Sequence, residues 1–123
     1  MKHLEQAAQI QVVRWLRQYH PEILFTSPAA AGERLSLPKA MRVKAMGYTP
    51  GTPDLLILER AGLFGALFIE MKRAKGGQVS KEQREFHEKL KGRGYFVAVC
   101  HGAQEAVDAI ATYMGVKTAM EKI

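Results

Sequence analysis

Gly51-Thr52-Pro53-Asp54 and Glu70-Met71-Lys72 are the two stretches of sequence that decide the fold of this chain. The first precedes a short apolar run at 55–58, and the second follows another apolar run at 66–69. Each run has the length of a buried strand. The residues between the runs, 59–65, include turn glycines and leave no room for a helix. The two runs therefore predict an antiparallel hairpin.

The register of this hairpin decides which side chains meet at its open end. A hairpin folded symmetrically about Gly62 places Asp54 directly opposite Glu70, unless a bulge shifts the pairing by one residue. Directly opposed residues have Cβ atoms roughly 4.5–5.5 Å apart. Two carboxylates at that separation repel each other unless a cation lies between them. The pairing therefore predicts a site for a divalent cation.

Alternation along the second strand adds an ammonium group to this site. Glu70 and Lys72 share one face of the strand, whereas Ile69 and Met71 point the other way, into the core. Phosphodiester hydrolysis uses this combination, because a metal organises water and phosphate while a fixed cation stabilises developing charge.

Length and composition indicate one globular domain, residues 1–123, with a polyanionic partner. The chain has 18 Lys and Arg against 12 Asp and Glu, a net charge of +6 and a pI of about 9.6. Nucleic acid is the first candidate for such a partner. No apolar segment has the length of a membrane span, and the N-terminus lacks a signal-peptide pattern. We therefore expect a cytoplasmic protein without a membrane partner.

Cysteine and histidine usage narrows the possible chemistry. Cys100 is the only cysteine, so an internal disulfide is impossible and a reducing, intracellular setting is expected. Because Cys100 ends an apolar run, it predicts a buried structural thiol rather than a nucleophile. The histidines are scattered without zinc-ligand spacing, which argues against a structural zinc site.

Outside the hairpin, the sequence predicts four helices and two further strands. The first helix spans 4–19, and its inward stripe is formed by Leu4, Ala8, Val12 and Leu16, widened by Trp15 and Tyr19. Ile10 and Val13 lie off this stripe, which favours cover by a partner. The other predicted elements are a strand at 23–26, a helix at 39–46, a helix at 81–91 capped by Ser80 and Gln83, a strand at 95–100 and a helix at 103–114.

This order of elements predicts an α/β protein with a mixed central sheet of about four strands flanked by helices. In the helix at 81–91 we expect Phe86 and Leu90 to face inward, and in the last helix Ala106, Val107, Ile110 and Met114. The strand at 95–100 shows no polar alternation, so we expect it to be buried on both faces.

Taken together, these motifs resemble a known family. Gly51–Asp54 followed by Glu70-Met71-Lys72 is similar to the PD-(D/E)XK nuclease signature, and the finer pattern resembles its VRR-NUC branch. That branch has an acid in the first helix, here Glu5, a basic segment before the G-x-P-D turn, and a Ser-x-x-Gln helix start, here Ser80 and Gln83. The resemblance covers roughly Leu4 to Met114. It implies a restriction-endonuclease-like core that uses Mg²⁺ or Mn²⁺.

The resemblance also implies roles for individual residues. Asp54 and Glu70 would bind the metal, with the Met71 carbonyl and, directly or through water, Glu5. Lys72 would orient or help to deprotonate the attacking water and stabilise charge. Gln83 would position that water or Lys72.

The expected DNA contacts are basic residues that flank this site in the sequence. They are Arg34, Lys39, Arg42, Lys44, Arg73, Lys75, Lys81 and Arg84. Phosphate contacts carry little sequence information, and no recognition helix is present, so recognition of DNA shape fits better. Stand-alone members of the resembled branch, of viral and bacterial type, are structure-selective nucleases, some of them homodimeric Holliday junction resolvases. A bacterial or phage-infected cell and a homodimer are the matching expectations.

Other functions remain open at this level. A flap or nicking nuclease, or a defence nuclease, would use the same chemistry, and a non-catalytic DNA-binding module could keep the fold. Single residues also have ordinary explanations. Asp54 suits a turn after proline, Glu70 and Lys72 suit a solvated pair, and Gln83 suits a helix cap. Glu5 suits the first turn of any helix, and the basic residues suit a solvated surface.

Overall fold

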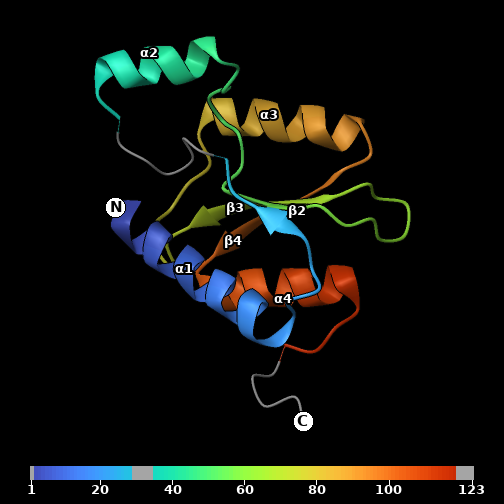
Figure 1. The fold of residues 1–123 in the computed structure, drawn as a ribbon. Coiled ribbons are helices and arrows are strands. Elements are labelled where there is room, and N and C mark those ends of the chain that lie inside the picture. The colour runs from blue at the N-terminus through green and yellow to red at the C-terminus, as the bar shows by residue number, and fades with distance from the viewer. Residues whose placement is uncertain (1, 29–34, 119–123) are drawn as a thin grey trace.

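A computed structural model describes residues 2–28 and 35–118 of the chain (Figure 1). The elements in chain order are α1 (Lys2–Tyr19), β1 (Phe25–Thr26), α2 (Leu37–Ala45), β2 (Leu55–Ile57), β3 (Leu67–Lys72), α3 (Lys81–Gly92), β4 (Phe96–His101) and α4 (Ala103–Met114). All four predicted helices are present. The strand predicted at 23–26 is reduced to β1, whereas Ile23 lies in the core.

The strands form one mixed sheet in the order β1-β2-β3-β4. β1 pairs with β2 and β2 with β3 in antiparallel fashion, whereas β3 and β4 are parallel. In the hairpin Leu55 pairs with Ile69 and Ile57 with Leu67. This pairing is symmetric about position 62 and confirms the predicted register.

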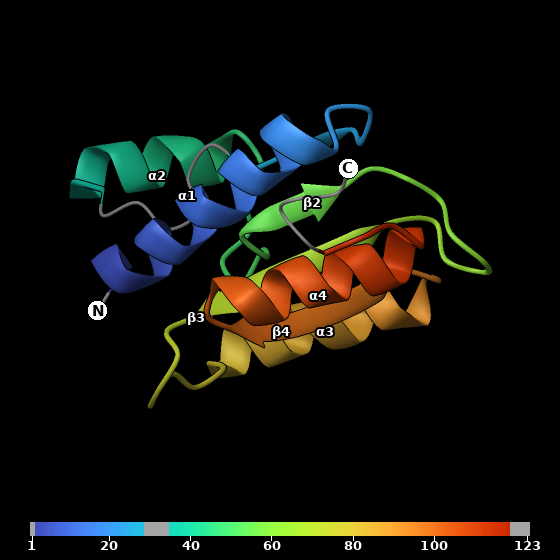
Figure 2. The ribbon, with the colours of Figure 1, turned by 90° about the horizontal axis from the view of Figure 1, so that it is seen from below.

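Helices cover both faces of the sheet. α1 and α4 pack against each other and against β3 on one face, as Figure 2 shows, whereas α3 covers β4 on the other face (Figure 1). α2 lies on the same side of the sheet as α3 and has no buried residue. The predicted α/β architecture, with a four-stranded mixed sheet between helices, is therefore confirmed.

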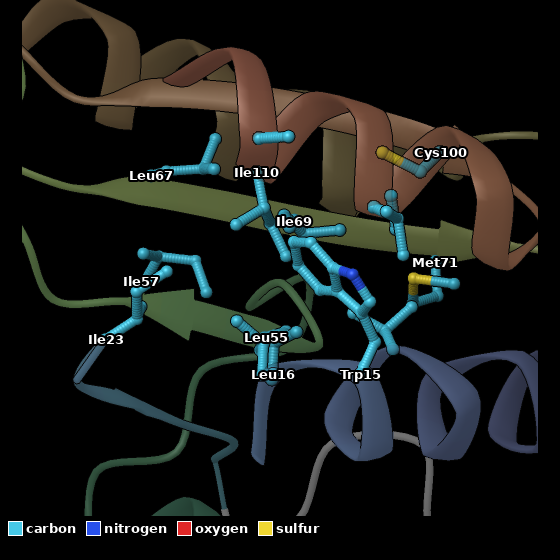
Figure 3. Packing of buried hydrophobic residues seen from close by; sticks show 14 residues of the cluster. Trp15, Leu16, Ile23, Leu55, Ile57, Leu67, Ile69, Met71, Cys100 and Ile110 are labelled. Atoms are coloured by element: carbon cyan, nitrogen blue, oxygen red, sulfur yellow. The ribbon is translucent and has the colours of Figure 1, made fainter. Parts of the chain in front are cut away.

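The hydrophobic core fills the space between the sheet and the α1–α4 pair. Figure 3 shows Trp15 and Leu16 of α1 and Ile110 of α4 meeting Leu55 and Ile69 of the hairpin. All five side chains are buried. Burial of this apolar surface supplies the main stabilisation of the domain.

Two expectations about burial are wrong. β4 is not buried on both faces, since Phe96 and Val99 are 42% and 36% exposed. The reason is that β4 is an edge strand that pairs only with β3. Leu4 is also exposed, while Ala8 is partly buried and Val12 fully buried. The first turn of α1 therefore extends past the surface against which the rest of the helix packs.

The predictions for Cys100 and for the inward face of the last helix are confirmed. Cys100 is buried, and burial raises the pKa of its thiol to about 12, so the group stays protonated and unreactive. In α4, Ala106, Val107 and Ile110 are buried and Met114 packs against the core. Within residues 2–28 and 35–118, no helix combines the length and the apolar character that a membrane crossing requires.

Candidate active site

The two faces of β3 carry different chemistry. Leu67, Ile69 and Met71 point toward α1 and α4 and are completely buried. Glu70 points toward α3 and is also buried, with only 2% of its surface exposed. Lys72 lies two residues further along β3, on the same face as Glu70, and is 7% exposed. The reading of Glu70 and Lys72 as a solvated surface pair is therefore wrong.

Asp54 is held at the open end of the hairpin by its backbone and its side chain. Its N–H donates to the Ile69 carbonyl at 2.9 Å, and its Oδ2 accepts the Met71 N–H at 2.7 Å. Its carbonyl accepts from Ser27 Oγ at 2.6 Å and from Gln9 Nε2 at 3.3 Å. This carboxylate is therefore fixed beside β3, which an ordinary turn residue would not be.

The G-x-P-D turn packs directly on the start of α3. Gly51 adopts φ +94°, and any Cβ at this position would overlap the backbone carbonyl of Glu82. Pro53 is fully buried in the same turn. Because only glycine permits this close approach, the turn and α3 are held together, and both border the acidic pair.

Two side chains of α3 bind the Glu70 carboxylate. Gln83 Nε2 donates to Oε2 at 3.0 Å, and His87 Nε2 lies 3.2 Å from Oε1. Gln83 also completes the predicted capping box, because its Oε1 accepts the Ser80 N–H at 2.9 Å. Capping and site contact are therefore two roles of one side chain. Sequence reasoning missed His87, although it lies four residues after Gln83, on the same face of the helix.

The acidic pair has the electrostatic character of a cation site. Burial, followed by a hydrogen bond to Glu70 and its negative charge, raises the pKa of Asp54 to about 7. The Met71 N–H and the charge of Lys72 oppose that shift without cancelling it. Lys72 forms no ion pair among residues 2–28 and 35–118. Two carboxylates this close fit a divalent metal, which commonly takes one or two carboxylates from a protein.

Glu5 stands one helical turn from a residue that touches the site. It precedes Gln9 by four positions in α1, and Gln9 donates to the Asp54 carbonyl. In the described part of the chain, no three His, Cys, Asp or Glu residues are close enough to hold one metal ion. Glu5 is therefore not assembled with Asp54 and Glu70 into a direct ligand set.

Tyr48 is a further neighbour that the sequence did not single out. Its pKa is raised, first by burial and then by the negative charges of Asp54 and Glu70. The phenol therefore lies within electrostatic reach of the acidic pair. The only sequence signal was its position in the turn that leads to Asp54.

The predicted DNA-binding residues lie on α2, on the loop after β3 and on the start of α3. Lys39, Arg42, Lys44, Lys75, Lys81 and Arg84 are exposed, and Arg73 is partly buried. Arg34 lies outside the described residues. Since α2 and α3 lie on the same side of the sheet, most of these cations lie on the side toward which Glu70 points (Figure 1).

Comparison with known proteins decides the family. A model of the VRR-NUC domain matches residues 3–104. The chain belongs to the VRR-NUC family. A solved structure of a VRR_NUC domain protein is 26% identical, with a TM-score of 0.76, and the match covers 91% of this chain and 88% of that one. No curated protein sequence matches the chain.

Membership of the VRR-NUC family implies a nuclease-type fold and confirms the resemblance that the motifs indicated. The matched range includes Asp54, Glu70, Lys72 and Gln83, whereas most of α4 lies beyond it. The family therefore accounts for the elements that build the site, and the last helix completes the core beneath them.

Proposed function

We propose that this VRR-NUC protein is a metal-dependent endonuclease that hydrolyses phosphodiester bonds in DNA. The observation that carries the proposal is the pairing of partly buried Asp54 with buried Glu70, whose interaction raises the pKa of Asp54, with Lys72 beside them. Burying like charges together is costly unless a cation joins them in the working state. In a nuclease-type fold, a metal bound at this site would serve phosphodiester hydrolysis.

Asp54 and Glu70 would bind Mg²⁺ or Mn²⁺. When bound, the metal supplies a water of lowered pKa and neutralises charge on the phosphate. The Met71 N–H donates to Asp54, and in the β3–β4 ladder the Lys72 carbonyl accepts the N–H of Gly102. Because backbone groups of successive strand residues face alternate edges, the Met71 carbonyl faces the Asp54 side and supports its role as a third ligand.

Glu5 is proposed to act through water, since it stands one turn beyond Gln9. Such a contact would orient a metal-bound water without a direct bond to the ion. Its position at the N-terminal turn of α1 also leaves its side chain only partly buried, so water can reach it.

Lys72 is the residue proposed to meet the scissile phosphate. Its side chain is 7% exposed and lies on the same face of β3 as Glu70. An ammonium held in this way stabilises negative charge that develops on the phosphate, and it can orient the attacking water. Gln83 holds Glu70 in place through Nε2, and through that contact it would help to position the water or Lys72.

The proposed substrate is branched DNA, and the finer proposal is a homodimeric Holliday junction resolvase. Exposed cations on α2, on the loop after β3 and on α3 suit phosphate contacts that read shape rather than sequence. Leu37, Met41 and Met46 are exposed on and beside α2, which supports cover by a second copy. Paired active sites would then make two symmetric nicks.

A cleavage assay on a four-way junction tests the proposal. The wild-type protein should cleave with Mg²⁺ or Mn²⁺ and stop when EDTA is added. Asp54→Asn and Glu70→Gln should each abolish cleavage while retaining junction binding, because both variants keep the shape of the site. Flap and plain-duplex substrates, together with the mass in solution, distinguish a dimeric resolvase from a flap or nicking nuclease.

One outcome would replace enzymatic cleavage with binding alone. A non-catalytic module would bind the junction with steep salt dependence, show no response to Mg²⁺ and leave the DNA intact. Full activity in purified Asp54→Asn or Glu70→Gln protein would remove that residue from the mechanism.

A further inference from the structure

We infer that His87 is a positioning residue that fixes the Glu70 carboxylate for metal binding, as one half of a two-point clamp whose other half is Gln83. This inference rests on the proposed metal-dependent function. It concerns a histidine that the motif pattern did not include.

The geometry of the contact is that of a buried donor facing a carboxylate. His87 is 5% exposed, and its Nε2 lies 3.2 Å from Glu70 Oε1. The ring donates to that oxygen through Nε2 both in the neutral form that carries its proton there and in the protonated form, because Nε2 bears a hydrogen in each.

Each oxygen of Glu70 then receives one hydrogen bond from α3. Gln83 takes Oε2 and His87 takes Oε1, and the two donors lie one helical turn apart. A carboxylate held at both oxygens cannot rotate freely. Glu70 and Asp54 also act on each other electrostatically. The clamp therefore fixes the orientation of Glu70 beside Asp54.

Packing alone does not account for a histidine here. Leu90, the other buried residue of α3, is apolar, and Phe86 is partly buried on the same helix. A leucine at 87 would fill similar space without the cost of burying a polar ring. The polar ring is useful because of the carboxylate in front of it. Outer-shell partners of metal ligands typically change metal affinity or activity about 10–100-fold when they are removed.

The experiment compares three replacements of His87 with a matched histidine elsewhere. His87→Leu and His87→Met remove the donor and retain apolar bulk, whereas His87→Gln places an amide N–H near the position of Nε2. The control is His20, which is also buried but contacts the Lys117 carbonyl at 2.9 Å. His20 also lies 3.6 Å from the Glu22 carboxylate, through Nδ1. His20→Leu therefore measures the loss of a buried histidine whose partners are not proposed metal ligands.

The readouts are the Mn²⁺ dissociation constant by calorimetry without DNA, and the Mg²⁺ concentration that gives half-maximal junction cleavage. We expect His87→Leu and His87→Met to raise both values about 10–100-fold. His87→Gln should stay within a few-fold of wild type, and His20→Leu should leave both values unchanged.

Three results would overturn the inference. One is unchanged metal affinity in His87→Leu or His87→Met. Another is an equal loss in His87→Gln, which would mean that ring shape rather than donation matters. The third is an equal loss in His20→Leu. If the wild-type protein binds Mn²⁺ but does not cleave DNA, the proposed function fails while calorimetry still tests the clamp. If it binds no metal, both proposals fail.

Discussion

The two faces of β3 are built from alternate residues of one strand and differ in almost every physical respect. On one face, Leu67, Ile69 and Met71 are apolar and buried against α1 and α4. On the other, Glu70 and Lys72 are also buried, beneath α3. Burial stabilises the first set, whereas it costs free energy for charged groups, which need hydrogen bonds and a counter-ion in compensation.

This difference separates stability from activity within a single strand. The apolar face holds the domain together and is closed to solvent. The polar face is maintained by contacts from α3 and from the G-x-P-D turn, and these contacts compensate only part of its electrostatic cost. Functional sites commonly carry strain or repulsion that the rest of the fold offsets. Mutations on the apolar face should therefore lower stability more than activity. Mutations on the polar face should lower activity more than stability.

The largest effect is expected on the apolar face. Ile69→Ala should lower the free energy of unfolding by about 2–5 kcal/mol, because it leaves a cavity in the centre of the core. Chemical denaturation measures this loss. Cleavage per folded molecule, assayed well below the melting temperature, should stay close to wild type, and a large loss there would contradict the separation of the two faces.

The second prediction is a loss of cleavage rate after a mutation on the polar face. Lys72→Met should lower the cleavage rate about 10²–10³-fold, as expected when one fixed donor to developing charge is removed. Thermal stability should be retained, since methionine fills the space of the lysine stem and Lys72 has no ion pair among the described residues. Parallel rate and melting measurements test this pair of outcomes, and unfolding of Lys72→Met would assign the residue to structure.

A third prediction concerns the turn that joins the two sides of the site. Gly51→Ala should cost about 1–3 kcal/mol in backbone strain alone and should also push the turn away from Glu82. We expect lower stability together with lower cleavage, because Asp54 loses its placement. Gly47→Ala is the matched control, with φ +114° but open space around its Cβ position. Equal activity in the two variants would show that the close approach is unimportant.

The fourth prediction is a pH dependence. The folded protein holds the Asp54 proton up to about pH 7, whereas the reference pKa is 3.8. Between these values the folded state binds more protons than the unfolded state, so this group makes the metal-free protein less stable as pH rises from about 4 to 7. Melting scans should show that decline, flattened in Asp54→Asn. Mg²⁺ should raise the melting temperature more at pH 8 than at pH 5.5, and the reverse order would contradict this assignment.

Local sequence patterns predicted much of the fold and half of the site. The hairpin register followed from two apolar runs around Gly62, and it placed Asp54 near Glu70 correctly. The apolar run at 95–100 led to a wrong prediction, burial on both faces, because an edge strand and a central strand can have the same composition. His87 was missed because its contact with Glu70 joins two elements of the fold, α3 and β3. Tyr48 was missed because only the folding of the turn brings its side chain within electrostatic reach of Asp54 and Glu70.

By itself the sequence determined the strands, the hairpin and the acid–acid–lysine set, because each depends on residues that are close in the chain or related by strand alternation. Only the tertiary structure decided which face of β3 lies beneath α3 and which donors bind Glu70. It also decided that Gly51 touches Glu82. These features depend on how separate helices pack on the sheet, which no local period encodes.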